Sequence, residues 1–272
     1  MPEPTAYGRR LAGRVAIVTG AGTEGDGVGI GRAIAVVLAG EGAHVCCVDL
    51  DQARADDTAA RLAAMGADAI ALAGDVTKAA DCARFVATTI ERFGRLDILV
   101  NNVGISTPVR LDTADEELWH RILDVNLTSA MLMSKFSVPR MIAGGGGAIV
   151  NISSIAGLRA HGGLAYGPSK AAMAQLAREI TVLHGRDGIR ANTVAPGHLM
   201  TPHAMHVLPA DAREARRKVG PLGIEGDAWD VARAVAFLAS DDARFIAGVH
   251  LAVDGGVTEI GPLTGHAFIT GA

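Results

Sequence analysis

Short apolar runs, many of them β-branched, alternate along this chain with longer stretches in which apolar residues recur every three to four positions. The short runs are typical of strands buried on both faces, and the longer stretches are typical of amphipathic helices. This alternation predicts a parallel sheet with helices on both faces. About seven strands are expected, at residues 15–19, 44–49, 69–73, 98–101, 148–152, 190–194 and 248–253. Helices are expected between them, for example at residues 31–39, 51–65, 79–93, 116–141, 166–184 and 228–240.

The alternation continues from one end of the chain to the other without a linker, so we expect one doubly wound, Rossmann-type α/β domain over residues 1–272. Residues 200–226 interrupt it, because they contain three prolines and no strand pattern. This interval is too long for a simple connection, and we interpret it as a lid over a binding site. The alternative is a surface excursion with a short helix at residues 211–218.

The composition is that of an ordinary globular protein, with 49% hydrophobic and 20% charged residues. A net charge of −4 gives no basic surface for nucleic acid, and no apolar run is long enough to span a membrane. Residues 1–10 lack the apolar core of a signal peptide, so we expect a cytoplasmic protein.

No metal site is expected from the cysteines and histidines. Cys46, Cys47 and Cys82 do not have metal-ligand spacing, and the first two lie inside an apolar run, where cysteine acts as a small hydrophobe. His203 and His206 lie close together in the interrupted interval, which is a weak basis for a zinc site.

Tyr166 opens a predicted helix and Lys170 follows four residues later, which places a phenol and an ammonium on the same helical face. A phenol ordinarily ionises near pH ~10, and a positive neighbour lowers that pKa. Such a tyrosine can exchange a proton with an alcohol or a carbonyl group near neutral pH. Taken alone, the same spacing also describes an ordinary exposed Tyr–Lys pair.

The first predicted strand runs into a glycine-rich loop that is followed by a helix. Glycines there let the backbone turn sharply and approach a pyrophosphate, whose charge faces the helix N-terminus. A G-x-G-x-x-G pattern begins at Gly20, but no helix starts directly after it. We therefore assign the turn to Gly20 and the close approach to Gly29, Ile30 and Gly31, with residues 22–28 as a bulged loop.

The second predicted strand ends in Asp49, which Leu50 follows. An acidic residue at this point can accept both ribose hydroxyls of the adenosine and repels a 2′-phosphate. No Arg or Lys follows directly, and the glycine loop carries Glu24 and Asp26 in place of a base. The pattern favours NAD over NADP. The alternative is that Asp49 only caps the following helix.

With these features in hand, the chain resembles the short-chain dehydrogenase/reductase family over residues 11–256. Eight short motifs carry the resemblance in the order that the family has them. They are the glycine loop, D-V at 75, N-N-V-G at 101, V-N-L at 125, N-I-S-S-I-A-G at 151, Y-G-P-S-K at 166, N-T-V-A-P-G at 192 and V-D-G-G at 253. The glycine loop is longer than the usual one, so the resemblance assigns no phosphate contacts to residues 22–28.

The resemblance implies a catalytic group of Asn126, Ser154, Tyr166 and Lys170. The usual spacing before Tyr166 points to Ser153, whereas the S-x-x-G motif points to Ser154. We favour Ser154, because a loop deletion shifts a count without moving a serine at a strand end. Besides the nucleotide residues above and the Tyr–Lys pair, the implied cofactor contacts are Asp75, Val76, Asn101, Asn102, Gly104, Pro196, Gly197, Leu199 and Thr201.

The implied reaction is reversible hydride transfer between NAD and a secondary alcohol, with a small-molecule alcohol or ketone as the partner. Tyr166 would exchange the alcohol proton, Ser154 would hydrogen-bond the same oxygen, and Lys170 would lower the phenol pKa and hold the ribose. Asn126 would kink its helix and hold a proton-relaying water. The substrate pocket is expected from residues 106–110, 155–163 and 199–208.

Family members are commonly tetramers, so we expect a homotetramer in which the apolar tail, residues 257–272, packs on a neighbouring subunit. Two alternatives remain for the function. One is an enoyl reductase on the same scaffold, in which the tyrosine and lysine are spaced more widely. The other is a dinucleotide-sensing protein that keeps the nucleotide site and has lost the chemistry.

Overall fold

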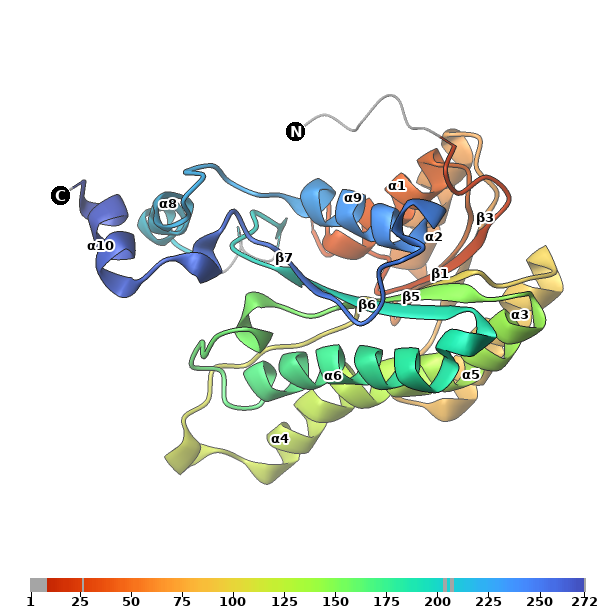
Figure 1. Ribbon diagram of the computed structural model, residues 1–272, viewed down its shortest axis with the longest axis horizontal. Coiled ribbons are helices and arrows are strands. Elements are labelled where there is room, and N and C mark those ends of the chain that lie inside the picture. The colour runs from red at the N-terminus through yellow and green to blue at the C-terminus, as the bar shows by residue number, and fades with distance from the viewer. Residues whose placement is uncertain (1–8, 26, 203–204, 206–207, 272) are drawn as a thin grey trace.

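The computed structural model describes residues 9–25, 27–202, 205 and 208–271. Seven parallel strands form one sheet in the order β3-β2-β1-β4-β5-β6-β7 (Figure 1). The strands are β1 (Val15–Thr19), β2 (His44–Asp49), β3 (Ala69–Ala73), β4 (Ile98–Asn101), β5 (Gly147–Ile152), β6 (Ile189–Pro196) and β7 (His250–Val253). The predicted doubly wound fold with about seven strands is confirmed, and the predicted strand ends differ from the observed ones by at most two residues.

Helices cover both faces of the sheet (Figure 1). One face carries α1 (Ile30–Gly40), α2 (Gln52–Ala64) and α9 (Ala228–Ala239). The other face carries α3 (Ala79–Phe93), α5 (Ser129–Ala143) and α6 (Tyr166–His184). The central strands are apolar and buried on both sides because each contributes to both of these cores.

The sheet fixes the position of a crevice. Strand order runs outward from β1 to β3 on one side and from β4 to β7 on the other, so the connections after β1 and β4 leave in opposite directions. In open parallel sheets such a reversal opens a crevice at the carboxyl ends of the strands, where ligands bind. The loops that carry the predicted site residues all follow these ends.

The predicted helix at residues 116–141 is wrong as a single α-helix. It divides into α4 (Glu116–Leu123), a π-helical turn (Asp124–Thr128) and α5. A π-turn inserts one extra residue into the helical ladder, which hydrophobic periodicity does not reveal. Such turns are frequent at functional sites, and Asn126 lies in this one.

The interval predicted as a lid contains α8 (Ala210–Val219), close to the short helix expected as its alternative. His203 and His206 lie outside the described residues. The chain ends in α10 (Pro262–Thr270), a helix that the sequence did not predict and that packs against α8. Figure 1 shows both helices together at one end of the molecule, away from the helices on the sheet.

The helices of the described part of the chain include none that is long and apolar enough to cross a membrane. Nor do three or more His, Cys, Asp or Glu side chains gather there in a possible metal site.

Candidate active site

The loop after β1 forms a close backbone cradle at the N-terminus of α1. Gly20 turns the chain with φ of 62°, and a Cβ on Gly31 would lie 1.9 Å from the Gly20 carbonyl oxygen. Only glycine permits this approach. Helix α1 begins at Ile30 with Gly29 as its N-cap and without a side-chain cap, so its first amides can meet an anion. The assignment of the turn and the close approach agrees with this geometry; Asp26 lies outside the described residues.

Asp49, at the end of β2, faces this loop. Its Oδ2 accepts a hydrogen bond from the Gly22 amide at 2.9 Å, and its Oδ1 accepts one from the Asp51 amide at 3.1 Å. The alternative that Asp49 caps α2 is wrong, because the N-cap is Asp51, which accepts from the Arg54 amide at 3.2 Å. Two residues, Leu50 and Asp51, separate the end of β2 from the start of α2.

Three of the predicted adenosine contacts lie beside the cleft and not among its lining residues. Leu50 is exposed, whereas Val76 is buried in the core under α3. Asp75 Oδ1 accepts hydrogen bonds from both the amide and the hydroxyl of Thr77, which orders the turn after β3.

Helix α6 brings the predicted phenol and ammonium together. Lys170 is 3% exposed and its Nζ lies 5.7 Å from the centroid of the Tyr166 ring. That nitrogen donates to the carbonyl oxygen of Ile152 at 2.9 Å, at the end of β5. A Cβ on Gly104 would approach it to 2.8 Å, so a glycine is required there. Burial lowers the pKa of Lys170 to about 8.

The phenol of Tyr166 is less acidic than an ordinary tyrosine in the protein alone. Burial raises its pKa above the ordinary value, and a hydrogen bond with Ser154 offsets only part of that increase. The physical reason is desolvation, which penalises the phenolate more than its neighbours stabilise it. The expected lowering of this pKa by Lys170, helped by a positive nicotinamide, stays a prediction for the nucleotide complex.

The two adjacent serines after β5 point in different directions. Ser154 is half-buried, faces Tyr166 and caps a short 3-10 turn, where its Oγ accepts from the Ala156 amide at 3.1 Å. Ser153 is buried, and its Oγ donates to the carbonyl oxygen of Lys170 at 2.7 Å. Both serines line the cleft, and Ser154, which the motif indicates, is the one that bonds Tyr166.

Asn126 is fully buried behind the cleft in the π-helical turn. Its Oδ1 accepts from the Ile105 amide at 2.8 Å, and its Nδ2 donates to the Ile105 carbonyl at 3.0 Å and to Ser169 Oγ at 2.9 Å. Ser169 in turn donates to the carbonyl oxygen of Tyr166 at 2.7 Å. Sequence reasoning missed Ser169, although it lies three residues after Tyr166 on the same helical face.

Asn101 and Asn102 have opposite roles at the end of β4. Asn102 lines the cleft and holds the β1 turn, since its Nδ2 donates to the carbonyl oxygens of Thr19 and Gly20. Asn101 is buried and donates to Asn151 Oδ1 at 2.9 Å, so its prediction as a lining residue is wrong. Successive side chains of a strand point to opposite faces, and only one of the pair can face the cofactor side.

These elements enclose a cleft of about 830 Å³. The predicted residues that line it are Gly20, Gly29, Ile30, Gly31, Asn102, Gly104, Ser154, Tyr166, Lys170, Pro196, Gly197, Leu199 and Thr201. Close packing again demands a glycine at position 197, where a Cβ would lie 2.4 Å from the Cβ of Asp254. Asn126, Asp49, Leu50, Asp75 and Val76 are not among the lining residues.

The end of the cleft away from the glycine loop carries polar groups from the loop before α6 and from the region after β6. The rings of His161 and His198 lie with their centroids 6.2 Å apart, and Arg216 reaches the cleft from α8. Burial, followed by the positive charge of Arg216, lowers the pKa of His198 to about 4. Sequence reasoning missed Arg216 because nothing in the pattern of α8 tells which of its basic residues faces inward.

Residues 25–258 match a protein-family model described as Enoyl-(Acyl carrier protein) reductase. The chain is 41% identical over 255 residues to cis-4-hydroxycyclohexanecarboxylate dehydrogenase of Sinomonas cyclohexanicum, covering 93% of this chain and 100% of that protein. It is 36% identical to 7alpha-hydroxysteroid dehydrogenase of Bacteroides fragilis, covering 92% and 96%.

Solved structures agree with these relatives. A crystal structure from Burkholderia xenovorans, assigned to the short-chain dehydrogenase/reductase family, superposes with a TM-score of 0.87 at 44% identity over 93% of this chain and 99% of that one. A 7alpha-hydroxysteroid dehydrogenase complexed with NADH and 7-oxo glycochenodeoxycholic acid gives 0.84 at 32% identity, over 91% and 95%. The predicted family is confirmed: this chain belongs to the short-chain dehydrogenase/reductase family of oxidoreductases.

Proposed function

We propose that this protein is an NAD(H)-dependent dehydrogenase that interconverts a secondary alcohol and a ketone. One observation carries the proposal. Tyr166, Ser154 and the buried Lys170 face a single cleft that continues to the glycine cradle at the start of α1. A proton-transfer group is thereby held beside a site with the shape and charge preference of a dinucleotide.

The residues around the cradle suit NAD. The glycine approach and the uncapped N-terminus of α1 suit a pyrophosphate, and the carboxylate of Asp49 suits an unphosphorylated ribose. Arg54 lies near Asp49, but its guanidinium faces the carboxylates of Glu24 and Asp51, at 3.4 and 3.6 Å. When bound, NAD would supply the carbon that accepts the hydride from the substrate alcohol.

Tyr166 would act as the general base in alcohol oxidation and as the general acid in ketone reduction. Ser154 already bonds the phenol, so a substrate oxygen that contacts both hydroxyls would keep a donor as charge develops on it. The raised phenol pKa of the protein alone keeps Tyr166 protonated, which suits the reduction direction. Oxidation would need additional positive charge near the phenol.

Lys170 would supply part of that charge and hold the cofactor ribose. Its Nζ donates to Ile152, which leaves further N–H groups for the cleft. Asn126 would act from behind: its bonds to Ile105 and Ser169 fix the segment after β4 against the first turn of α6. A water on the Asn126 side would pass protons between Lys170 and solvent.

We propose an alicyclic secondary alcohol as the substrate. The relatives named above act on a hydroxycyclohexanecarboxylate and on a hydroxysteroid, and a further relative, 38% identical over 97% of this chain, is (+)-borneol dehydrogenase 2 of Salvia officinalis. All three substrates carry their hydroxyl on a saturated ring. Residues 200–226 would close over such a ring as a lid, with α8 as its helical part.

The test is NADH absorbance during incubation of the purified protein with a panel of ring alcohols and ketones, including 4-hydroxycyclohexanecarboxylate, with NAD and NADP compared. We expect turnover with at least one ring alcohol and a preference for NAD. Binding of NADH without turnover across the panel would favour the dinucleotide sensor instead.

The description of the matched family model names an enoyl reductase, which was one of the predicted alternatives. The four-residue separation of Tyr166 and Lys170 favours the alcohol dehydrogenase, because enoyl reductases on this scaffold space the pair more widely. Including an enoyl thioester in the same panel separates the two, since only an enoyl reductase would oxidise NADH with it.

We further propose that the protein forms a homotetramer in the cytoplasm, with residues 257–272 at a subunit contact. Val182, Leu183 and Phe245 are exposed apolar side chains on the described surface, which suits subunit contacts. Cys46, Cys47 and Cys82 are free thiols, which suits a reducing compartment. Light scattering of the purified protein tests the oligomer.

A further inference from the structure

The substrate end of the cleft has an uneven charge distribution. Its described lining includes His161, His198 and Arg216, together with Tyr166 and Lys170. Among the lining residues that the structure describes, the one carboxylate is Glu24, which belongs to the glycine loop at the nucleotide end. Asp254 is near enough to His198 to influence its pKa but does not line the cleft.

Arg216 is the unusual member of this group. Two basic neighbours on the same helix are paired outside the cleft: Arg217 donates to both oxygens of Glu214, and Lys218 Nζ lies 3.7 Å from the same carboxylate. Arg216 makes no hydrogen bond or ion pair with any side chain in the described part of the chain, although it is half-buried. Burial lowers its pKa, but a guanidinium remains charged at neutral pH.

His198 lies at the same place. The backbone of Arg216 hydrogen-bonds its ring, and its Nδ1 is buried without a hydrogen-bond partner among the described residues. Because its pKa is about 4, the imidazole is neutral at pH 7 and adds no second charge beside Arg216. A partly buried cation without a partner is costly unless a ligand completes it.

We infer that Arg216, beside His198, forms a subsite for a carboxylate of the substrate, so that the substrate is a ring hydroxy acid and not a neutral ring alcohol. A guanidinium matches the two oxygens of a carboxylate in a bidentate pair. The subsite rests on the proposed function, because it orients an alcohol toward Tyr166.

Packed residues connect the proposed subsite to Tyr166. His198 packs beside His161, and Gly163, two residues further on, lies so close to Tyr166 that an added Cβ would meet its Cβ at 3.3 Å. All of these residues line the same cleft. A ring with a carboxylate at one side and a hydroxyl at the other would meet Arg216 and Tyr166 within this one cleft.

The test compares 4-hydroxycyclohexanecarboxylate with its neutral carboxamide, which has nearly the same shape. In the wild-type protein with NAD, we expect kcat/KM to favour the carboxylate by about 10- to 100-fold, the range for a charge-assisted pair. Arg216→Gln should abolish that preference, chiefly by lowering kcat/KM for the carboxylate. Lys218→Gln removes the same charge from the same helix outside the cleft and should keep the preference.

A second measurement separates failure of the subsite from failure of the proposed reaction. Cyclohexanecarboxylate and cyclohexanecarboxamide, which carry no hydroxyl, are titrated into the protein–NADH complex and binding is followed by NADH fluorescence. Tighter binding of the carboxylate that is lost in Arg216→Gln supports the subsite even if no alcohol is turned over. Turnover of neutral ring alcohols without any carboxylate preference overturns the subsite and leaves the dehydrogenase standing. Weaker NADH binding in Arg216→Gln, equal for both probes, would assign Arg216 to the cofactor and also overturn it.

Discussion

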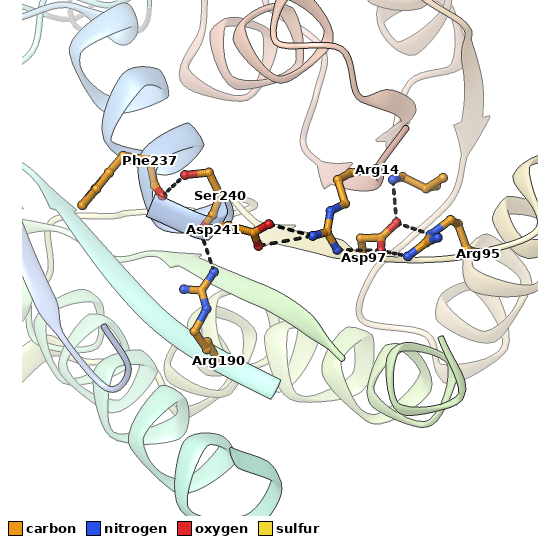
Figure 2. Close-up of polar contacts among 8 residues, drawn as sticks. Arg14, Arg95, Asp97, Arg190, Phe237, Ser240 and Asp241 are labelled. Carbon is orange, nitrogen blue, oxygen red and sulfur yellow. Dashed lines mark hydrogen bonds and ion pairs between the residues drawn. The ribbon is translucent and has the colours of Figure 1, made fainter. Parts of the chain in front are cut away.

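The two ends of the sheet treat buried charge in opposite ways. At the amino end, Asp97 is 2% exposed and fully partnered: it accepts from the Val15 amide at 2.9 Å and from Arg95 at 2.6 and 2.8 Å, and Arg14 lies 3.4 Å away. Figure 2 shows Asp97 between the two arginines. Asp241 in turn binds Arg14 at 3.1 Å.

Arg190, near the start of β6, connects this strand to the C-terminus of α9. Its guanidinium donates to the carbonyl oxygen of Leu238 at 2.8 Å and to that of Ser240 at 3.0 Å, both at the C-terminus of the helix. Figure 2 shows Arg190 beside Ser240. Ser240 also donates to the Phe237 carbonyl at 2.8 Å. Cations at a helix C-terminus interact favourably with its dipole. The amino end therefore joins β1, β4, β6 and α9 without an unpaired charge among these residues.

At the carboxyl end, buried or half-buried cationic groups have no partner of opposite charge in the described part of the chain. Lys170 is as buried as Asp97, but its partners are the carbonyl oxygen of Ile152 and the sulfur of Met173, and no carboxylate of the described residues pairs with it. The Nδ1 of His198 is buried without a hydrogen-bond partner, and the Arg216 guanidinium has no side-chain partner, among the residues that the structure describes. Groups with shifted pKa values cluster at functional sites because completing them is left to the ligand. The paired charges at the amino end stabilise the fold, whereas the groups at the carboxyl end are available to a bound ligand.

Tyr166→Phe should give the largest effect at the carboxyl end. Removing the proton-transfer group should lower turnover by about 10²–10⁴-fold, while the ring keeps its packing. Initial rates with the best ring alcohol measure this. NADH binding by fluorescence and the melting temperature should stay close to wild type, and turnover near that of the wild type would remove Tyr166 from the mechanism.

Lys170→Met tests whether the buried ammonium costs stability. The pKa of Lys170 is about 8 in the folded protein and near ~10.4 in the unfolded chain, so between these values the unfolded chain binds more protons. Stability of the wild type relative to Lys170→Met should therefore rise with pH from about 8 to about 10.4, by on the order of 3 kcal/mol in total, and be flat below pH 8.

Urea denaturation of both proteins across this pH range gives the difference directly. Lys218→Met, which removes an exposed lysine, serves as the control and should show no comparable rise. Parallel curves for the wild type and Lys170→Met would mean that the ammonium is not desolvated.

Asp97→Ala tests the amino end. It leaves the Val15 amide and Arg95 without their acceptor and Arg14 with Asp241 alone, and we expect a loss of about 3 kcal/mol in the free energy of unfolding. Asp68→Asn breaks an exposed pair with Arg92 and should change stability by no more than about 0.5 kcal/mol. Kinetic constants should stay near wild type in both variants. A large loss of kcat in Asp97→Ala at full folding would show that the two ends are coupled.

Ser154→Ala and Ser153→Ala form a matched pair at the boundary between site and scaffold. Ser154→Ala should lower kcat by about 10²-fold, the effect of losing one donor to a developing oxyanion. Ser153→Ala removes the bond to the Lys170 carbonyl and should cost about 1 kcal/mol of stability with a much smaller change in kcat. The reverse outcome would make the usual spacing before Tyr166, which points to Ser153, the better guide to the catalytic serine.

The fold and most of the lining residues were predictable from the sequence because their signals are local. Strand runs, the glycine loop and the Tyr166–Lys170 spacing each express a backbone requirement within a few residues. Gly20 and Gly31 illustrate this: positive φ at one and a carbonyl 1.9 Å from the Cβ position of the other exclude larger residues. Asn101 was mispredicted because neighbouring strand residues face opposite sides and the motif does not tell which one faces the cofactor.

Sequence alone determined the family, the doubly wound order of elements and which residue types lie at the strand ends, because periodicity and motif spacing follow from backbone geometry. Only the tertiary structure decided the burial and the bonding partners of each group. The phenol of Tyr166 is made less acidic by burial, Ser154 and not its neighbour bonds that phenol, and the Arg216 guanidinium has no side-chain partner among the described residues while that of Arg217 has one. These properties depend on desolvation and on partners distant in the chain, and neither is encoded in spacing along it.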